Sequence, residues 1–100
     1  MTLAQLELEV IQWAQSKGLL SAENSHAQMC KVAEEVGETA SALLKGDRAA
    51  LKDGIGDIAV TIIILAAQND MTLNGCLTAA YNEIKNRTGR IERGTFIKDG

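Results

Sequence analysis

The sequence predicts an all-α protein built as a four-helix bundle. Apolar residues recur at three- and four-residue steps in four successive segments, the loops between these segments are short, and the chain has no proline. One hundred residues with 46% hydrophobic composition suffice for one compact domain with a modest core. We therefore expect residues 1–100 to form a single domain.

The first helix is expected over about residues 2–17. Its apolar stripe consists of Leu3, Leu6, Val10, Trp13 and Ala14. Gly18 follows at the position of a C-terminal cap, because glycine adopts the left-handed conformation that often ends a helix. The stretch "GLLSAENS" is then a connecting loop, in which Ser21 or Asn24 is a suitable N-cap for the second helix.

The second helix is expected to end at Gly46, and the third to begin after its N-cap, Asp47. The second helix has one apolar stripe, formed by Met29, Val32, Ala33, Val36, Ala40, Leu43 and Leu44. The third is apolar on nearly all sides, through Leu51, Ile55, Ile58, Ala59, Val60, Ile62, Ile63, Ile64, Leu65 and Ala66. Such a helix is buried on several sides, and in a short chain a second subunit is the simplest cover. The sequence therefore predicts a homodimer or homotetramer.

A fourth helix is expected over about residues 72–86. Its inward stripe would consist of Leu77, Ala80, Tyr81 and Ile84. The tail "TGRIERGTFIKDG" then breaks the helical period. Its segment "IERGTFI" is expected to form a short hairpin or an arm that lies on a neighbouring subunit.

The composition argues against a nucleic-acid-binding protein and against a membrane protein. A net charge of −3 argues against general nucleic-acid binding, which usually requires a basic face. The most apolar run, residues 58–67, is too short to span a membrane. Cys30 and Cys76 lack metal-type spacing, and in a chain without a secretory signal both thiols are expected to stay reduced. We expect a cytoplasmic protein that associates with neither nucleic acid nor membrane.

An acidic cluster interrupts the apolar stripe of the second helix, in "KVAEEVGETA". Glu35 and Glu38 are three residues apart and project from nearly the same side, next to Glu34. Like charges at this spacing repel by about 0.2–0.5 kcal/mol per pair. On the third helix Asp53 and Asp57 are four residues apart and also share a face. Glu35 and Asp57 each lie eleven residues from the turn at position 46, so antiparallel packing would place them at similar height.

Four converging carboxylates would not all stay ionised in a helix bundle without a cation. Oxygen-only ligands suit Mg²⁺ or Mn²⁺. The alternative is that these acids lie on a solvated face, and that Asp47 and Asp53 only favour a helix N-terminus. A di-iron bundle would need a second Glu-x-x-His pair besides Glu23 and His26, and no phosphate-binding glycine loop is present.

The motifs "EEVGE" and "DGIGDIAV" resemble those of the all-α nucleotide pyrophosphohydrolases, the MazG-like group related to dimeric dUTPases and dCTP pyrophosphatases. The family pattern is Glu-Glu-x-x-Glu followed by Glu-x-x-Asp on the next helix, and the resemblance covers about residues 10–90. It implies that Glu35, Glu38 and Asp57 bind Mg²⁺. The family's other glutamate falls on Gly54, so the resemblance leaves Asp53 or a water molecule as the fourth ligand.

The resemblance also implies a nucleotide site. Glu34 would act as a base or would orient the ligands. The segment "AYNEIKNRTGR" resembles the region where the family contacts nucleotide, which implicates Asn82, Lys85 and Arg87, although a cation there also favours a helix C-terminus. Other candidates are Lys31 for phosphate and Gln12 with Trp13 for the base, although a core position is the stronger expectation for Trp13.

The expected function is therefore Mg²⁺-dependent hydrolysis of a nucleoside triphosphate to a nucleoside monophosphate and pyrophosphate. Its role would be the control or cleaning of the nucleotide pool. The ion would neutralise charge at the phosphates while one carboxylate orients or deprotonates water. The alternative is a non-catalytic α-helical dimer that serves as an interaction module, with Gly54 marking a degenerate metal site.

Overall fold

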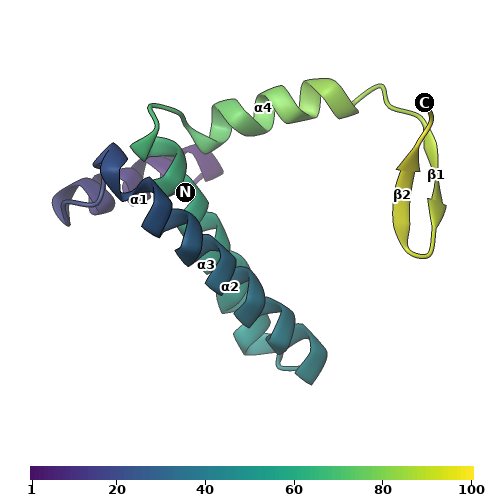
Figure 1. Ribbon diagram of the computed structural model, residues 1–100, viewed down its shortest axis with the longest axis horizontal. Helices are drawn as coiled ribbons and strands as arrows, with labels where there is room; N and C mark the ends of the chain where they lie inside the picture. Colours follow the sequence, from purple (N-terminus) through teal and green to yellow (C-terminus); the bar gives the residue numbers. More distant parts are fainter.

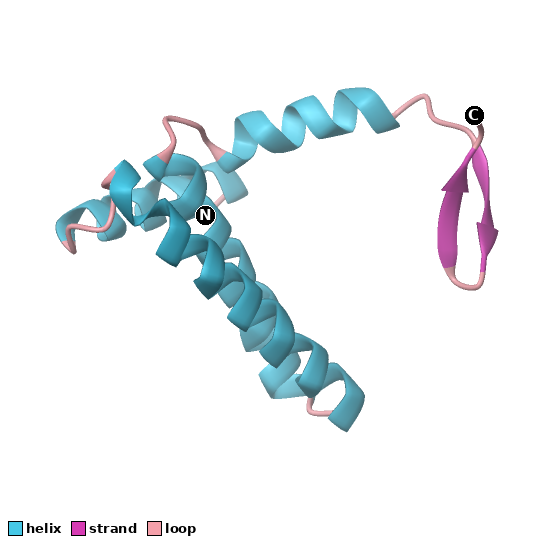
Figure 2. Cartoon of the chain, viewed as in Figure 1, coloured by secondary structure: helices cyan, strands magenta, loops and turns pink.

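The computed structural model describes all residues from 1 to 100, and it is mainly helical (Figure 1). The helices are α1 (Leu3–Ser16), α2 (Ser25–Lys45), α3 (Arg48–Gln68) and α4 (Leu73–Ile84). A single 3₁₀ turn, Ala22–Asn24, precedes α2, and a hairpin of β1 (Gly89–Glu92) and β2 (Thr95–Lys98) ends the chain (Figure 2). The predicted all-α class is confirmed. The C-terminal tail forms a short hairpin, one of the two structures predicted for it.

Local capping explains where the helices begin and end. Thr2 and Gln5 form a reciprocal capping box at the start of α1. The Asp47 side chain accepts a hydrogen bond from the backbone N–H of Ala50 and caps α3, as predicted. Gly46 ends α2 with φ of 71°, a left-handed conformation that glycine adopts without strain.

Helices α2 and α3 pack along each other as an antiparallel pair, which forms one limb of the molecule (Figures 1 and 2). Thr39 of α2 faces Gly54 of α3 at short range. A Cβ atom on Gly54 would lie only 3.0 Å from the Thr39 Cβ and 3.2 Å from its Cα, both of which are fixed by the backbone. Gly54 is therefore the position that lets the two helices approach each other.

Gly54→Ala is expected to lower the free energy of unfolding by about 1–3 kcal/mol, because overpacking here outweighs the better helix propensity of alanine. Gly37→Ala is the matched control, since an added Cβ there meets nothing within 4 Å. It should raise the free energy of unfolding by about 0.5–1 kcal/mol. Urea denaturation measures both changes, and equal stabilisation by the two substitutions would contradict the close contact at Gly54.

A buried carboxylate joins α1 to α4. Glu7 is only 7% exposed. Its two carboxylate oxygens accept hydrogen bonds from the backbone N–H groups of Leu73 and Asn74, with N–O distances of 2.6 and 3.1 Å. These N–H groups belong to the first turn of α4, where helical amides lack partners within the helix. Glu7 therefore fixes the start of α4 against α1.

The rest of α4 extends away from the other three helices, so that the molecule is open and horseshoe-like (Figure 1). Leu77, Tyr81 and Ile84 are more than half exposed, and the prediction that they point inward is wrong within one chain. Trp13 is 52% exposed, so its expected core position is wrong as well. In both cases the same chain leaves about half of each apolar side chain uncovered.

The structure also bears on the thiols and on membrane insertion. Cys30 and Cys76 are both exposed and unbonded. None of the helices combines the length and the apolar character needed to cross a bilayer.

Candidate metal and nucleotide site

The α2–α3 pair brings the two acidic motifs to the same level. Starting from the Thr39–Gly54 contact, Glu35 lies about one turn back along α2 and Asp57 about one turn forward along α3. Since the helices are antiparallel, both steps lead away from the connecting loop. At about 100° per residue, Glu38 and Asp57 then lie along the same edge of the pair. We call this edge, with Glu34, Glu35, Glu38, Asp53 and Asp57, the acidic edge.

Glu35 is the one carboxylate of the acidic edge that is buried. It is 8% exposed, and its carboxylate contacts a single cation. Its nearest cation is the ammonium of Lys31, 3.6 Å from one carboxylate oxygen. A buried carboxylate normally has several donors or a metal ion around it, so Glu35 can still accept a cation.

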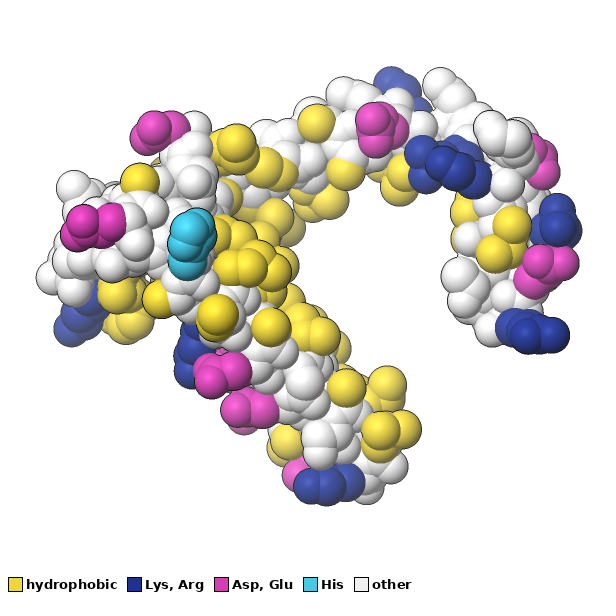
Figure 3. Space-filling view, in the orientation of Figure 1, with side chains coloured by type: hydrophobic (Ala, Val, Ile, Leu, Met, Phe, Trp, Pro, Cys, Tyr) yellow, Lys and Arg dark blue, Asp and Glu magenta, His cyan; other side chains and the backbone are white.

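Lys31 also contacts Glu34, at 3.4 Å, and both side chains are more than half exposed. The hydrogen bond and the charge of Glu34 raise the pKa of the Lys31 ammonium above its usual value, with a smaller contribution from the charge of Glu35. Lys31 was predicted as a phosphate ligand, and it does lie beside the acidic edge. Figure 3 shows acidic side chains (magenta) gathered on α2 next to basic ones (dark blue).

The carboxylate oxygens of the acidic edge are suitable ligands for a hard cation, although their side chains do not converge on a single ion position. No three Asp, Glu, His or Cys side chains approach closely enough to hold a metal ion. Glu38, Asp53 and Asp57 are exposed, so their side chains are free to change rotamer. Gly54 contributes no ligand, and the close contact with Thr39 leaves no room for one.

The predicted nucleotide-binding residues lie in two separate places. Asn82, Lys85 and Arg87 are exposed, on the last turn of α4 and just after it, far from the middle of α2 and α3 (Figure 1). Trp13 lies on α1. One chain therefore does not bring these residues to its own acidic edge.

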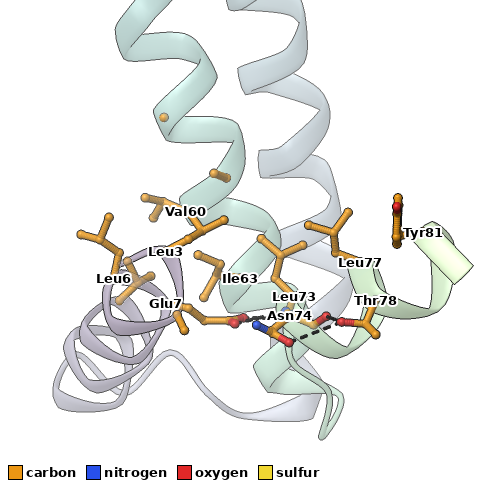
Figure 4. Close-up of a pocket in the computed structure, with 14 residues that line it drawn as sticks. Leu3, Leu6, Glu7, Val60, Ile63, Leu73, Asn74, Leu77, Thr78 and Tyr81 are labelled. Atoms are coloured by element: carbon orange, nitrogen blue, oxygen red, sulfur yellow. Dashed lines mark hydrogen bonds between the residues drawn. The ribbon is translucent and has the colours of Figure 1, made fainter. Parts of the chain in front are cut away.

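Sequence reasoning missed an apolar pocket of about 420 Å³ between α1, α3 and α4 (Figure 4). Its walls include Leu6, Val60, Ile63, Leu73 and Leu77, with the buried carboxylate of Glu7 at its base. The only signal in the sequence was a glutamate on the apolar stripe of the first helix. An acidic residue there indicates a hydrogen-bond partner inside the fold.

Comparison with known proteins identifies the class. Residues 23–90 match the family described as MazG nucleotide pyrophosphohydrolase domain, and this region contains α2, α3 and α4 with the whole acidic edge. The chain therefore belongs to the MazG nucleotide pyrophosphohydrolase domain family, as its motifs indicated.

A relative is also known from a phage. The chain is 39% identical over 67 residues to an uncharacterized 18.2 kDa protein from the rep–hol intergenic region of Haemophilus phage HP1. The match covers 67% of this chain and 41% of that protein, so the chain spans less than half of the relative. No solved structure matches the chain significantly.

Proposed function

We propose that the protein is a Mg²⁺-dependent nucleoside triphosphate pyrophosphohydrolase, with Mn²⁺ as a substitute ion. One observation carries the proposal: carboxylates of α2 and α3 lie at the same level along one edge, within the region that matches the family. Glu35, Glu38 and Asp57 would hold the ion, with Asp53 in place of the side chain that Gly54 lacks. When bound, the ion would neutralise negative charge on the phosphates.

The protein's own residues would position the substrate and the water. The water oxygen attacks the α-phosphorus, the bond from that phosphorus to the oxygen bridging the β-phosphate breaks, and pyrophosphate leaves. A carboxylate of the acidic edge takes the proton of the water. Glu34 and Glu38 are exposed and can reach a water molecule, whereas the buried Glu35 is suited to binding the ion.

The remaining candidates would bind the nucleotide. Lys31 already lies beside Glu34 and Glu35, so it can contact a phosphate once a cation neutralises them. Asn82, Lys85 and Arg87 would supply further polar and positive groups, and Trp13 has an exposed ring that a base can stack on.

The proposal is tested by a screen of all NTPs and dNTPs, with inorganic pyrophosphatase added so that pyrophosphate is detected as phosphate. A bound ion should also raise the melting temperature, because a ligand at 100 times its Kd stabilises the folded state by about 2.7 kcal/mol. For a domain of this size that corresponds to a shift of roughly 10 °C or more. No turnover and no response to Mg²⁺ or Mn²⁺ would instead support a non-catalytic interaction module.

The assembly is proposed to be a homodimer or homotetramer. On the side of the α2–α3 pair opposite the acidic edge, large apolar side chains remain exposed, and they include Met29 (51%), Val36 (49%), Leu43 (63%) and Ile55 (59%). Closed symmetry between copies of the chain is the usual way to cover such a surface.

A further inference from the structure

The β1–β2 hairpin lies apart from the helices (Figure 2). All eight of its strand residues are exposed, and its register places Ile91 opposite Phe96. These two side chains form an apolar face, with 70% of Ile91 and 47% of Phe96 exposed. An isolated two-stranded hairpin is only marginally stable in water, so a defined hairpin with an apolar face requires something to pack against.

The size of the whole chain indicates what covers this face. The chain exposes 7506 Å², whereas a compact monomer of its mass exposes about 5,500 Å². Its radius of gyration is 15.8 Å, against about 13 Å for a compact domain of 100 residues. The excess area exceeds the roughly 800 Å² that each partner contributes to a standard interface. A second copy of the same chain is large enough to cover it.

The distribution of charge along the sequence also indicates that a second copy of the chain covers the hairpin. Residues 85–100 carry five basic and two acidic side chains, a net charge of +3, and residues 1–84 carry five basic and eleven acidic ones, a net charge of −6. The C-terminal arm, residues 85–100, is thus opposite in charge to the helices of any other copy. Figure 3 shows basic side chains (dark blue) on the arm, whereas the acidic side chains (magenta) of α2 lie on the edge that faces away from the concave side. Such a distribution favours contact between the arm of one copy and the helices of the next.

The tip of the hairpin presents an arginine. Arg93 has φ of 52° and is followed by Gly94 at 78°, so both central residues of the turn are left-handed. Asparagine or glycine adopts this conformation with less strain than arginine. Arg90 pairs with Glu92 at 3.3 Å, but Arg93 makes no ion pair. Arg93 is therefore a free guanidinium at the far end of a positively charged arm.

We propose that two copies of the chain exchange their C-terminal arms. The Ile91–Phe96 face would pack on the α2–α3 pair of the partner, and Arg93 would contact the triphosphate held at the partner's acidic edge. Each site is then incomplete without the other copy, which accounts for the distance between the arm and the acidic edge of its own chain. The role of Arg93 rests on the proposed function, whereas the docking of the arm does not.

Subunit complementation tests the role of Arg93. Arg93→Ala should lower kcat/KM by about 10- to 100-fold, as expected for a charged hydrogen bond to phosphate, and Glu38→Gln should be inactive. When the two variants are refolded together in equal amounts, activity should rise to about a quarter of wild type, because half of the random dimers then contain one intact site. A mixture no more active than the mean of the separate variants would overturn the contribution in trans.

Matched variants separate the docking from the chemistry. Arg90→Ala, which removes the same charge from the strand, should leave kcat/KM within about twofold of wild type. Phe96→Ser should convert the dimer to a monomer in light scattering at micromolar concentration, and Thr95→Ala on the other face of the hairpin should not. A wild-type monomer, or a Phe96→Ser dimer as stable as wild type, would overturn the docking even if no nucleotide is hydrolysed.

Discussion

Glu38→Gln is expected to lower Mg²⁺-dependent pyrophosphohydrolysis by more than about 100-fold, since even groups that only support a metal ligand change activity by about 10- to 100-fold. The amide keeps the shape of the side chain but removes an anionic ligand. Glu38 is exposed and makes no hydrogen bond or ion pair in the chain, so the fold does not depend on its charge. The helical circular dichroism should therefore be unchanged while initial rates fall.

The control for this substitution is Glu9→Gln, which removes an exposed glutamate from α1. It should keep wild-type turnover, because Glu9 lies outside the acidic edge. The Glu38 variant should also lose most of the thermal stabilisation by Mg²⁺, a readout that does not depend on choosing the right nucleotide. Turnover that persists in purified Glu38→Gln would remove Glu38 from the site.

Helix positions were predictable because the signals that start and stop helices are local. Gly46 and Asp47 mark the α2–α3 turn in the sequence and act there in the structure. Counting residues outward from this turn also placed Glu35 and Asp57 at the same level. That argument needs only the rise per residue and an antiparallel pair.

The arrangement of α4 was not predictable from its own residues. An apolar stripe such as Leu77, Tyr81 and Ile84 shows that something covers it, but the cover can be the same chain or another. The close contact of Thr39 with Gly54 was also missed, because a glycine at a motif position first indicates a lost ligand. The structure adds a second reason for the glycine, since any side chain there would push the two helices apart.

Asp53 is the residue on which the metal proposal and its alternative differ most. It is the sixth residue of α3, beyond the first turn to which the favourable effect of a helix N-terminus is limited. Asp47 already provides the N-cap. The structure thus weakens the explanation that Asp53 serves only to start the helix, and it leaves the carboxylate exposed at the acidic edge.

Asp53→Asn is therefore expected to keep the wild-type melting temperature in the absence of metal but to lose most activity and most Mg²⁺-induced stabilisation. Asp57→Asn should be equally inactive, because the two residues are one turn apart and about 40° around the axis, within reach of a single ion. Scanning calorimetry with and without Mg²⁺, beside steady-state kinetics, measures both effects. If Asp53→Asn stays near wild type while Asp57→Asn is inactive, Asp53 is not a ligand. The ion would then be held by Glu35, Glu38 and Asp57, with water as the fourth ligand.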